Sequence, residues 1–175
     1  MSQFTAVIEM AAASGLMLMD GSRNNDPMLA SSQGTGELIA AAIDAGATRI
    51  IVGAGGSACT DGGIGAIEVL KSYGSLDGSR GIEVIIATDV QTRFLDAAFI
   101  FGPQKGATKI QVNNLTQRLH SLANDFRLKY SIDVTRIPGS GAAGGFAGGM
   151  AALGARLEHG FDLIVEEIGF QEAMN

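Results

Sequence analysis

The chain has 175 residues, of which 46% are hydrophobic and 17% are charged, and its formal net charge is −6. This length suits one domain with a sizeable core, and the acidic balance excludes the basic footprint of a nucleic-acid binder. No apolar run is long enough to span a membrane, the N-terminus lacks a signal-peptide pattern, and the single cysteine, Cys59, excludes an internal disulfide, so we expect a cytoplasmic protein.

The first part of the chain predicts a strand, a polar loop and a helix. Thr5–Met10 has the pattern of a short buried strand. Asp20–Gln33 is rich in Asp, Asn, Ser, Gly and Pro, which is typical of an exposed loop. Alanine and aliphatic residues at helical spacing over Glu37–Ala45 predict a helix that ends at Gly46, with Thr35 as a candidate N-cap.

The middle of the chain predicts two further strands, each followed by a helix. The β-branched run Arg49–Val52 predicts a central parallel strand, and a helix is expected from about Gly63 to Tyr73. After a turn over Leu76–Gly81, Glu83–Ala87 predicts the next strand. The apolar segment Phe94–Phe101 predicts a short helix.

The last part predicts two helices and a segment of open assignment. Thr108–Tyr130 carries apolar residues at helical spacing and predicts a long amphipathic helix. Asp133–Ile137 leads into a glycine cluster, and the helix after it is expected to reach about Leu157. Phe161–Ile168 fits a strand or a helix. The alternation predicts an α/β domain with three layers, α/β/α, around a mainly parallel or mixed sheet.

Sixteen of the 25 glycines gather in four segments: Gly34–Gly36, Gly53–Gly65, Gly102–Gly106 and Gly139–Gly149. Glycine permits positive φ and lets a ligand approach the backbone closely, and loops after parallel strands are where α/β domains bind ligands. Without a basic surface, an anion would be held by backbone N–H groups, helix N-termini, one or two cationic side chains or a metal. These loops therefore predict an anion site, most simply for a phosphorylated ligand.

The segment Arg49–Gly65 carries the strongest signal. Its candidate anion-binding residues are Gly55, Gly56 and Ser57, which follow the predicted central strand. The segment lacks the P-loop pattern and a clean dinucleotide fingerprint, which counts against a Rossmann oxidoreductase without removing that alternative. The competing interpretation is a tight strand–helix turn in which Asp61 caps the helix.

Two other glycine segments add candidates. In the last cluster these are Ser140, Gly141, Gly144 and Gly145, whose alternative role is close helix packing against the sheet. Lys105, beside Gln104, is a compact donor to phosphate or a solvated turn lysine.

Two carboxylates follow predicted strands, Asp61 and Asp89, so both are expected at one edge of the sheet. Beside a phosphate site they would bind Mg²⁺, or one would act as a base toward a substrate hydroxyl. Helix capping or a turn is the alternative for each. His120 and His159 are not assigned to catalysis.

Together these segments resemble the type I glycerate kinase family. The matching pieces are AVIEMAAASGL (Ala6–Leu16), GTGELI (Gly34–Ile39), IIVGAGGSACTDGGIG (Ile50–Gly65), ATDV (Ala87–Val90), FGPQKGAT (Phe101–Thr108) and IPGSGAAGGFAGG (Ile137–Gly149). The resemblance implies phosphorylation of D-glycerate by ATP with Mg²⁺, usually at the 2-hydroxyl. On this basis the substrate- or phosphate-binding candidates also include Gly34, Thr35, Gly36 and Gln104, with Arg23 or Arg93 on the glycerate carboxylate.

Family members are about twice this length and resemble two α/β domains, one of them flavodoxin-like and built from both chain ends. Residues 1–175 resemble the inserted domain alone, and the stretch between Leu70 and Glu83 is shorter than the family's. We therefore expect a missing companion domain and weak or no kinase activity for this chain by itself. A homodimer and a non-catalytic ligand-binding or regulatory domain stay open.

Overall fold

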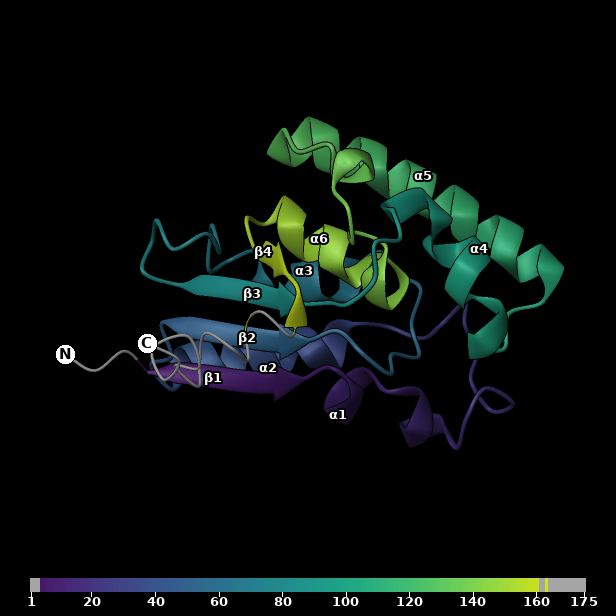
Figure 1. Ribbon diagram of the computed structural model, residues 1–175, viewed down its shortest axis with the longest axis horizontal. Helices are drawn as coiled ribbons and strands as arrows, with labels where there is room; N and C mark the ends of the chain where they lie inside the picture. Colours follow the sequence, from purple (N-terminus) through teal and green to yellow (C-terminus); the bar gives the residue numbers. More distant parts are fainter. Residues whose placement is uncertain (1–3, 161–162, 164–175) are drawn as a thin grey trace, which may run out of the picture.

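A computed structural model describes residues 4–160 and 163 of the chain. Four parallel strands form one sheet in the order β1-β2-β3-β4: β1 (Thr5–Glu9), β2 (Arg49–Gly53), β3 (Glu83–Ala87) and β4 (Arg156–Glu158). Their carboxyl ends point to the same side, toward α1 (Ala11–Ser14) (Figure 1). The α/β class and the parallel sheet expected from the sequence are confirmed.

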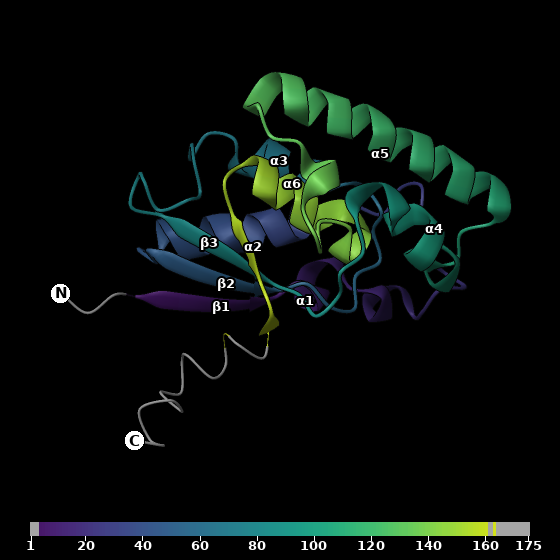
Figure 2. The ribbon, with the colours of Figure 1, turned by 45° about the horizontal axis from the view of Figure 1, so that its top comes forward.

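Four of the helices in the described part of the chain stack on one face of this sheet. Figure 2 shows α2 (Gln33–Asp44), α3 (Ile64–Leu70) and α6 (Phe146–Ala152) against the strands, and α5 (Lys109–Tyr130) outside them. A short helix, α4 (Ala97–Phe101), precedes α5. On the other face, Leu163 packs against Ile51 and Ile85. The segment 161–168, whose assignment the sequence leaves open, otherwise lies outside the described residues.

The central strands follow from their sequences. The three middle residues of β2 and of β3 are buried, as expected for β-branched runs covered on both faces. Among the described residues β1 pairs with β2 alone, so the first strand is an edge strand there and not the buried strand expected, and Val7 is 78% exposed.

The long helix α5 matches the predicted range because local signals define both its ends. Thr108 and Gln111 form a reciprocal capping box at the start. Ser131 adopts a left-handed conformation, with φ of 60°, directly after the last turn. Phe126 faces inward and meets Phe94 edge-on, with 6.0 Å between ring centroids.

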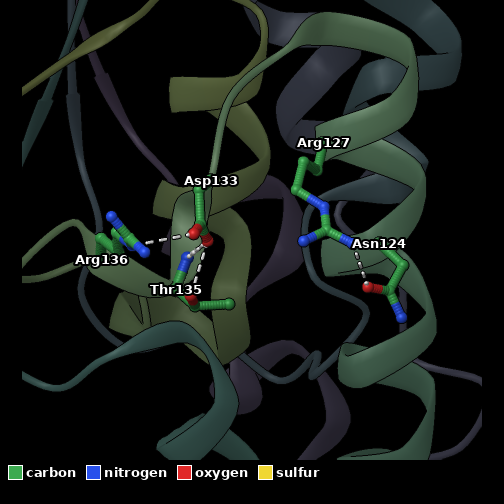
Figure 3. A network of polar contacts seen from close by, with 5 residues as sticks. All are labelled: Asn124, Arg127, Asp133, Thr135 and Arg136. Atoms are coloured by element: carbon green, nitrogen blue, oxygen red, sulfur yellow. Dashed lines mark hydrogen bonds and ion pairs between the residues drawn. The ribbon is translucent and has the colours of Figure 1, made fainter.

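The turn after α5 returns the chain toward the last glycine cluster. Oδ1 of Asp133 accepts hydrogen bonds from the Thr135 backbone N–H and hydroxyl, and Oδ2 pairs with Arg136 (Figure 3). The hydrogen bonds from Thr135 lower the pKa of the Asp133 carboxyl. Arg127 donates separately to Asn124 at the end of α5. This polar network stabilises a turn and lies away from the carboxyl edge of the sheet.

Two expectations about element ends and one about the exposure of a loop are wrong. The helix expected to reach Leu157 ends at Ala152, and the chain enters β4 instead, because backbone pairing with β3 outweighs local helical spacing. Ser32, not Thr35, stands at the N-cap of α2. The loop over Asp20–Gln33 is not wholly exposed, since Asn25 and Ser32 are buried in it.

Candidate functional site

The largest cavity near the predicted site residues lies at the carboxyl edge of the sheet and has a volume of about 670 Å³. Loops that follow all four strands contribute to it, as expected for a ligand site in an α/β domain. Six of the predicted site residues line it: Gly55, Gly56, Ser57, Asp89, Gln104 and Lys105.

The loop after β2 presents backbone to this cavity. Gly55 and Gly56 are exposed, and Gly56 has a positive φ of 66°. Within residues 4–160 and 163, neither of their N–H groups meets a protein acceptor. The Gly56 carbonyl accepts a hydrogen bond from Leu16, which holds the loop against the segment after α1. Two unpaired N–H groups in a fixed loop are suited to an anion.

Lys105 reaches the same loop from the 3₁₀ turn Pro103–Lys105. Its side chain is buried, with 3% of the residue exposed, and Nζ donates to Ser57 Oγ at 2.8 Å and to the Cys59 carbonyl. Burial lowers the pKa of this ammonium group, and neighbouring Cys59 and Asp61 oppose the shift. The alternative of a solvated turn lysine is therefore wrong.

The thiol of Cys59 lies inside this arrangement and takes no part in the cavity surface. It is fully buried, and burial together with the charge of Asp61 raises its pKa well above the ordinary value. A thiol held in the protonated state is a poor nucleophile. This agrees with leaving Cys59 out of the candidate catalytic residues.

Asp89 stands at the mouth of the cavity, directly beyond β3. Its side chain is 73% exposed, and Oδ1 accepts a hydrogen bond of 3.1 Å from the Gly160 N–H. His159 Nε2 lies 3.6 Å from the same oxygen. Oδ2 has no protein partner in the described part of the chain, so it faces outward to solvent or ligand.

Asp61 occupies a different environment. It is 4% exposed and does not line the cavity. Its Oδ2 accepts from the Ser32 N–H and hydroxyl, each at 2.8 Å, and from the Gly65 N–H, while Oδ1 accepts from the Gly63 N–H. The contacts fit the alternative in which Asp61 caps the start of α3 and ties it to the residue before α2.

The second glycine loop also differs from the expectation. An added Cβ at Gly144 would lie 2.2 Å from the Cys59 carbonyl oxygen, and one at Gly145 would lie 2.9 Å from the ring of Phe94. The hydroxyl of Ser140 is fully buried and accepts from the Phe94 N–H. These glycines are used for close packing, as the alternative interpretation proposed.

Gly141 belongs to the same packed group, because an added Cβ there would lie 2.3 Å from the Arg93 carbonyl oxygen. From this loop Ala142 and Ala143 reach the cavity. Ala143 adopts a left-handed conformation with φ of 53°, which is unusual for alanine and carries no signal in the sequence.

The GTGELI segment lies away from the cavity. Its glycines are inside α2, where an added Cβ at Gly34 would lie 2.9 Å from the Ala13 carbonyl oxygen and one at Gly36 would lie 2.7 Å from Ala66. Thr35 donates its hydroxyl to Ser14 Oγ at 2.8 Å. The structure therefore places these three candidates in the packing of α2 against α1 and α3.

The two candidate arginines, Arg23 and Arg93, are exposed and do not line the cavity. The sequence missed other lining residues, Leu16, Met17 and Thr88, and it also missed Asn25, which holds the Lys105 loop. Aliphatic and small polar residues carry no signal that separates a cavity wall from a core.

In residues 4–160 and 163, no three or more His, Cys, Asp or Glu side chains gather as a cluster that could hold a metal ion. Among the same residues, no helix combines the length and apolar character needed to cross a membrane.

Comparisons with known proteins point to one family. The sequence model of the glycerate kinase family matches residues 1–77 and 74–175. An uncharacterised protein of Mycobacterium tuberculosis is 44% identical over 176 residues, covering 96% of this chain and 45% of its own. Glycerate 2-kinase of Escherichia coli is 37% identical over 197 residues, covering 96% of this chain and 51% of its own.

A solved structure has a similar fold. A crystal structure from Salmonella typhimurium LT2, of a protein provisionally named glycerate kinase 2, superposes with a TM-score of 0.83 at 34% identity. The match covers 93% of this chain and 52% of that one. The chain spans about half the length of the curated relatives it matches.

Proposed function

The chain belongs to the glycerate kinase family, and from this premise we propose that its cavity serves the phosphorylation of D-glycerate by ATP, at the 2-hydroxyl. The names of relatives, glycerate 2-kinase in E. coli and glycerate kinase in Bacillus subtilis, support the reaction class. The observation that carries the proposal is the convergence of Gly55, Ser57, Lys105 and Asp89 on one cavity.

Phosphoryl transfer depends mainly on positioning and on neutralising charge. In this proposal the N–H groups of Gly55 and Gly56 bind oxygen atoms of a phosphate or of the glycerate carboxylate. The Ser57 hydroxyl accepts from Lys105 and can donate its own proton to the same anion. Lys105 then contributes its positive charge at the base of the loop, and the exposed amide of Gln104 adds a donor at the rim.

Asp89 is the carboxylate best placed for chemistry, since it lines the cavity and keeps Oδ2 available. It would accept the proton of the glycerate hydroxyl or hold Mg²⁺. Mg²⁺ binds through one or two carboxylates together with phosphate oxygens and water, which Asp89 satisfies and Asp61, with both oxygens engaged, does not. When bound, this ion would neutralise charge on the phosphates of ATP.

We further propose that the cavity is half of a cleft. The chain corresponds to about half the length of its curated relatives, and the cavity lies open at the sheet edge. The remaining half of those longer proteins would contribute the opposite wall. The chain alone would then bind ligands at this cavity and turn over slowly.

Calorimetry on this chain tests the binding step, with D-glycerate, 2-phosphoglycerate and MgATP as separate ligands. We expect binding of at least one phosphorylated ligand, weakened by Lys105→Ala and unchanged by Lys109→Ala, the matched substitution at an exposed lysine. If none of the three ligands binds, the proposed function is wrong.

An ADP-release assay with D-glycerate and MgATP tests the half-cleft. Little turnover is expected from this chain. Rapid turnover by this chain, abolished by Asp89→Asn, would support the proposed reaction. It would overturn the proposal that the cavity is only half of a cleft. Binding of 2-phosphoglycerate with no turnover even in a protein that contains the other half would favour a non-catalytic ligand-binding domain.

A further inference from the structure

Asn25 is a buried amide in a segment whose composition predicts an exposed loop. The residue is 8% exposed, whereas its neighbours Asn24 and Asp26 are exposed. It lies between the 3₁₀ turn Leu16–Met19 and α2. A polar side chain buried between exposed neighbours is held there by specific hydrogen bonds.

Those hydrogen bonds connect Asn25 to the backbone of two loops that contribute to the cavity. Asn25 Nδ2 donates to the Lys105 carbonyl oxygen at 2.8 Å and to the Ala58 carbonyl oxygen at 3.1 Å. Ala58 stands between Ser57 and Cys59, the two residues that accept from Lys105 Nζ. One amide therefore joins the backbone of Lys105 to the loop that receives its ammonium group.

A second close contact joins the segment that contains Asn25 to the residue after Lys105. Gly106 has φ of 92°, and an added Cβ would lie 2.3 Å from the Ser22 carbonyl oxygen. Arg118 of α5 donates to the Met28 carbonyl oxygen at 3.0 Å and anchors the far end of the segment. The segment is thus fixed on both sides of Asn25.

The identity of the side chain matters for this role. An amide nitrogen offers two N–H donors, which match two carbonyl acceptors. A carboxylate of the same size would place oxygen against both carbonyls. The amide oxygen Oδ1 has no partner within the described residues, so the side chain is held through its nitrogen alone.

We propose that Asn25 is a positioning residue that sets the ammonium group of Lys105 in the cavity and thereby tunes its affinity for a phosphorylated anion. The effect on affinity rests on the proposed function of Lys105. The positioning itself does not, because Asn25 does not line the cavity and acts through Lys105.

Chemical labelling of lysine tests the positioning without any ligand. The chain is acetylated briefly with acetic anhydride, and mass spectrometry compares Lys105 with Lys109, an exposed internal reference. Asn25→Ala and Asn25→Asp should raise labelling of Lys105 several-fold and leave Lys109 unchanged. Asn24→Ala, at the exposed neighbour, is the matched control and should change neither.

Unchanged labelling of Lys105 in folded Asn25 variants overturns the proposal. If circular dichroism shows that the alanine variant does not fold, labelling of Lys105 is measured in Asn25→Ser, which keeps one donor. A rise at Lys105 in the serine variant supports the proposal, and no rise overturns it.

A double-mutant cycle on the binding of 2-phosphoglycerate completes the test. Asn25→Ala should weaken binding about tenfold when Lys105 is present, the effect of losing one well-placed charged hydrogen bond. It should have little further effect in the Lys105→Ala background. Equal losses in both backgrounds overturn the inference, whereas a wild-type chain that binds neither 2-phosphoglycerate nor inorganic phosphate overturns the proposed function alone.

Discussion

Two glycine-rich loops of similar composition have different structural roles in this protein. In Gly53–Gly65, Gly55 and Gly56 line the cavity, and an added Cβ at Gly55 would meet nothing within 4 Å. In Gly139–Gly149 the glycines pack instead, and an added Cβ at Gly149 would lie 2.4 Å from the Gly62 carbonyl oxygen. Glycine leaves room for a ligand in one loop and for another stretch of backbone in the other.

The same contrast separates the two candidate aspartates. Asp61 is buried and accepts four hydrogen bonds, whereas Asp89 is exposed at the cavity and keeps one oxygen available. Both residues follow a strand in the sequence, so only their surroundings distinguish a structural carboxylate from a candidate catalytic one. Substitutions at packed residues and at cavity residues test this contrast.

The largest effect on stability is expected from Gly144→Ala. The added methyl group would meet the Cys59 carbonyl at 2.2 Å, and alanine would have to keep φ near 69°. Overpacking and strain together should lower the free energy of unfolding by about 3 kcal/mol or more. Urea unfolding measures this change, and a variant as stable as the wild type would mean that this loop is not packed as described.

A smaller loss of stability is expected from Asp61→Asn. An amide cannot accept all four hydrogen bonds from Ser32, Gly63 and Gly65, and the free energy of unfolding should fall by about 1.5–3 kcal/mol. Asp89→Asn is the matched comparison and should stay within about 0.5 kcal/mol, as an exposed site. Equal stability of the two variants would remove the distinction between the aspartates.

Lys105→Met should change how stability depends on pH. Burial holds the folded-state pKa of Lys105 below its ordinary value of 10.5. Between these two pKa values the unfolded chain binds a proton that the folded chain has released, so wild-type stability from this group rises with pH.

The slope of that rise is at most about 1.4 kcal/mol per pH unit, and it should be missing in the methionine variant. Urea unfolding of both proteins from neutral pH to pH 10 measures the difference. Parallel curves would mean that the Lys105 ammonium is not desolvated in the folded chain. Lys109→Met, at an exposed lysine, provides the control.

The smallest effect on stability is expected from Gly55→Ala. The φ of Gly55 is not in the left-handed region and the added methyl group meets no atom, so the free energy of unfolding should change by less than about 0.5 kcal/mol. Calorimetry with inorganic phosphate should nevertheless show weaker binding, because the methyl group projects where an anion would approach. A large loss of stability would place Gly55 among the packing glycines.

Several elements could be predicted because their signals are local. The β-branched run Arg49–Val52 and the run Glu83–Ala87 predicted β2 and β3 with ends close to those observed, and apolar residues at helical spacing over Thr108–Tyr130 predicted α5. Lys105 and the Gly55–Ser57 loop were also identified, because each lies in a glycine-rich segment of the sequence. The short strand β4 was missed because three residues, 156–158, carry too little pattern to outweigh the helix before them.

The sequence by itself therefore determined the α/β class, three of the four parallel strands, the family and the loops in which a site would lie. The tertiary structure alone decided which glycines pack, which aspartate reaches the cavity and which amide holds Lys105. The physical reason is distance along the chain: Asp61 is satisfied by Ser32, 29 positions away, and Asn25 by Lys105, 80 positions away. Local patterns encode elements, but the burial of a polar group depends on partners that only the folded chain brings together.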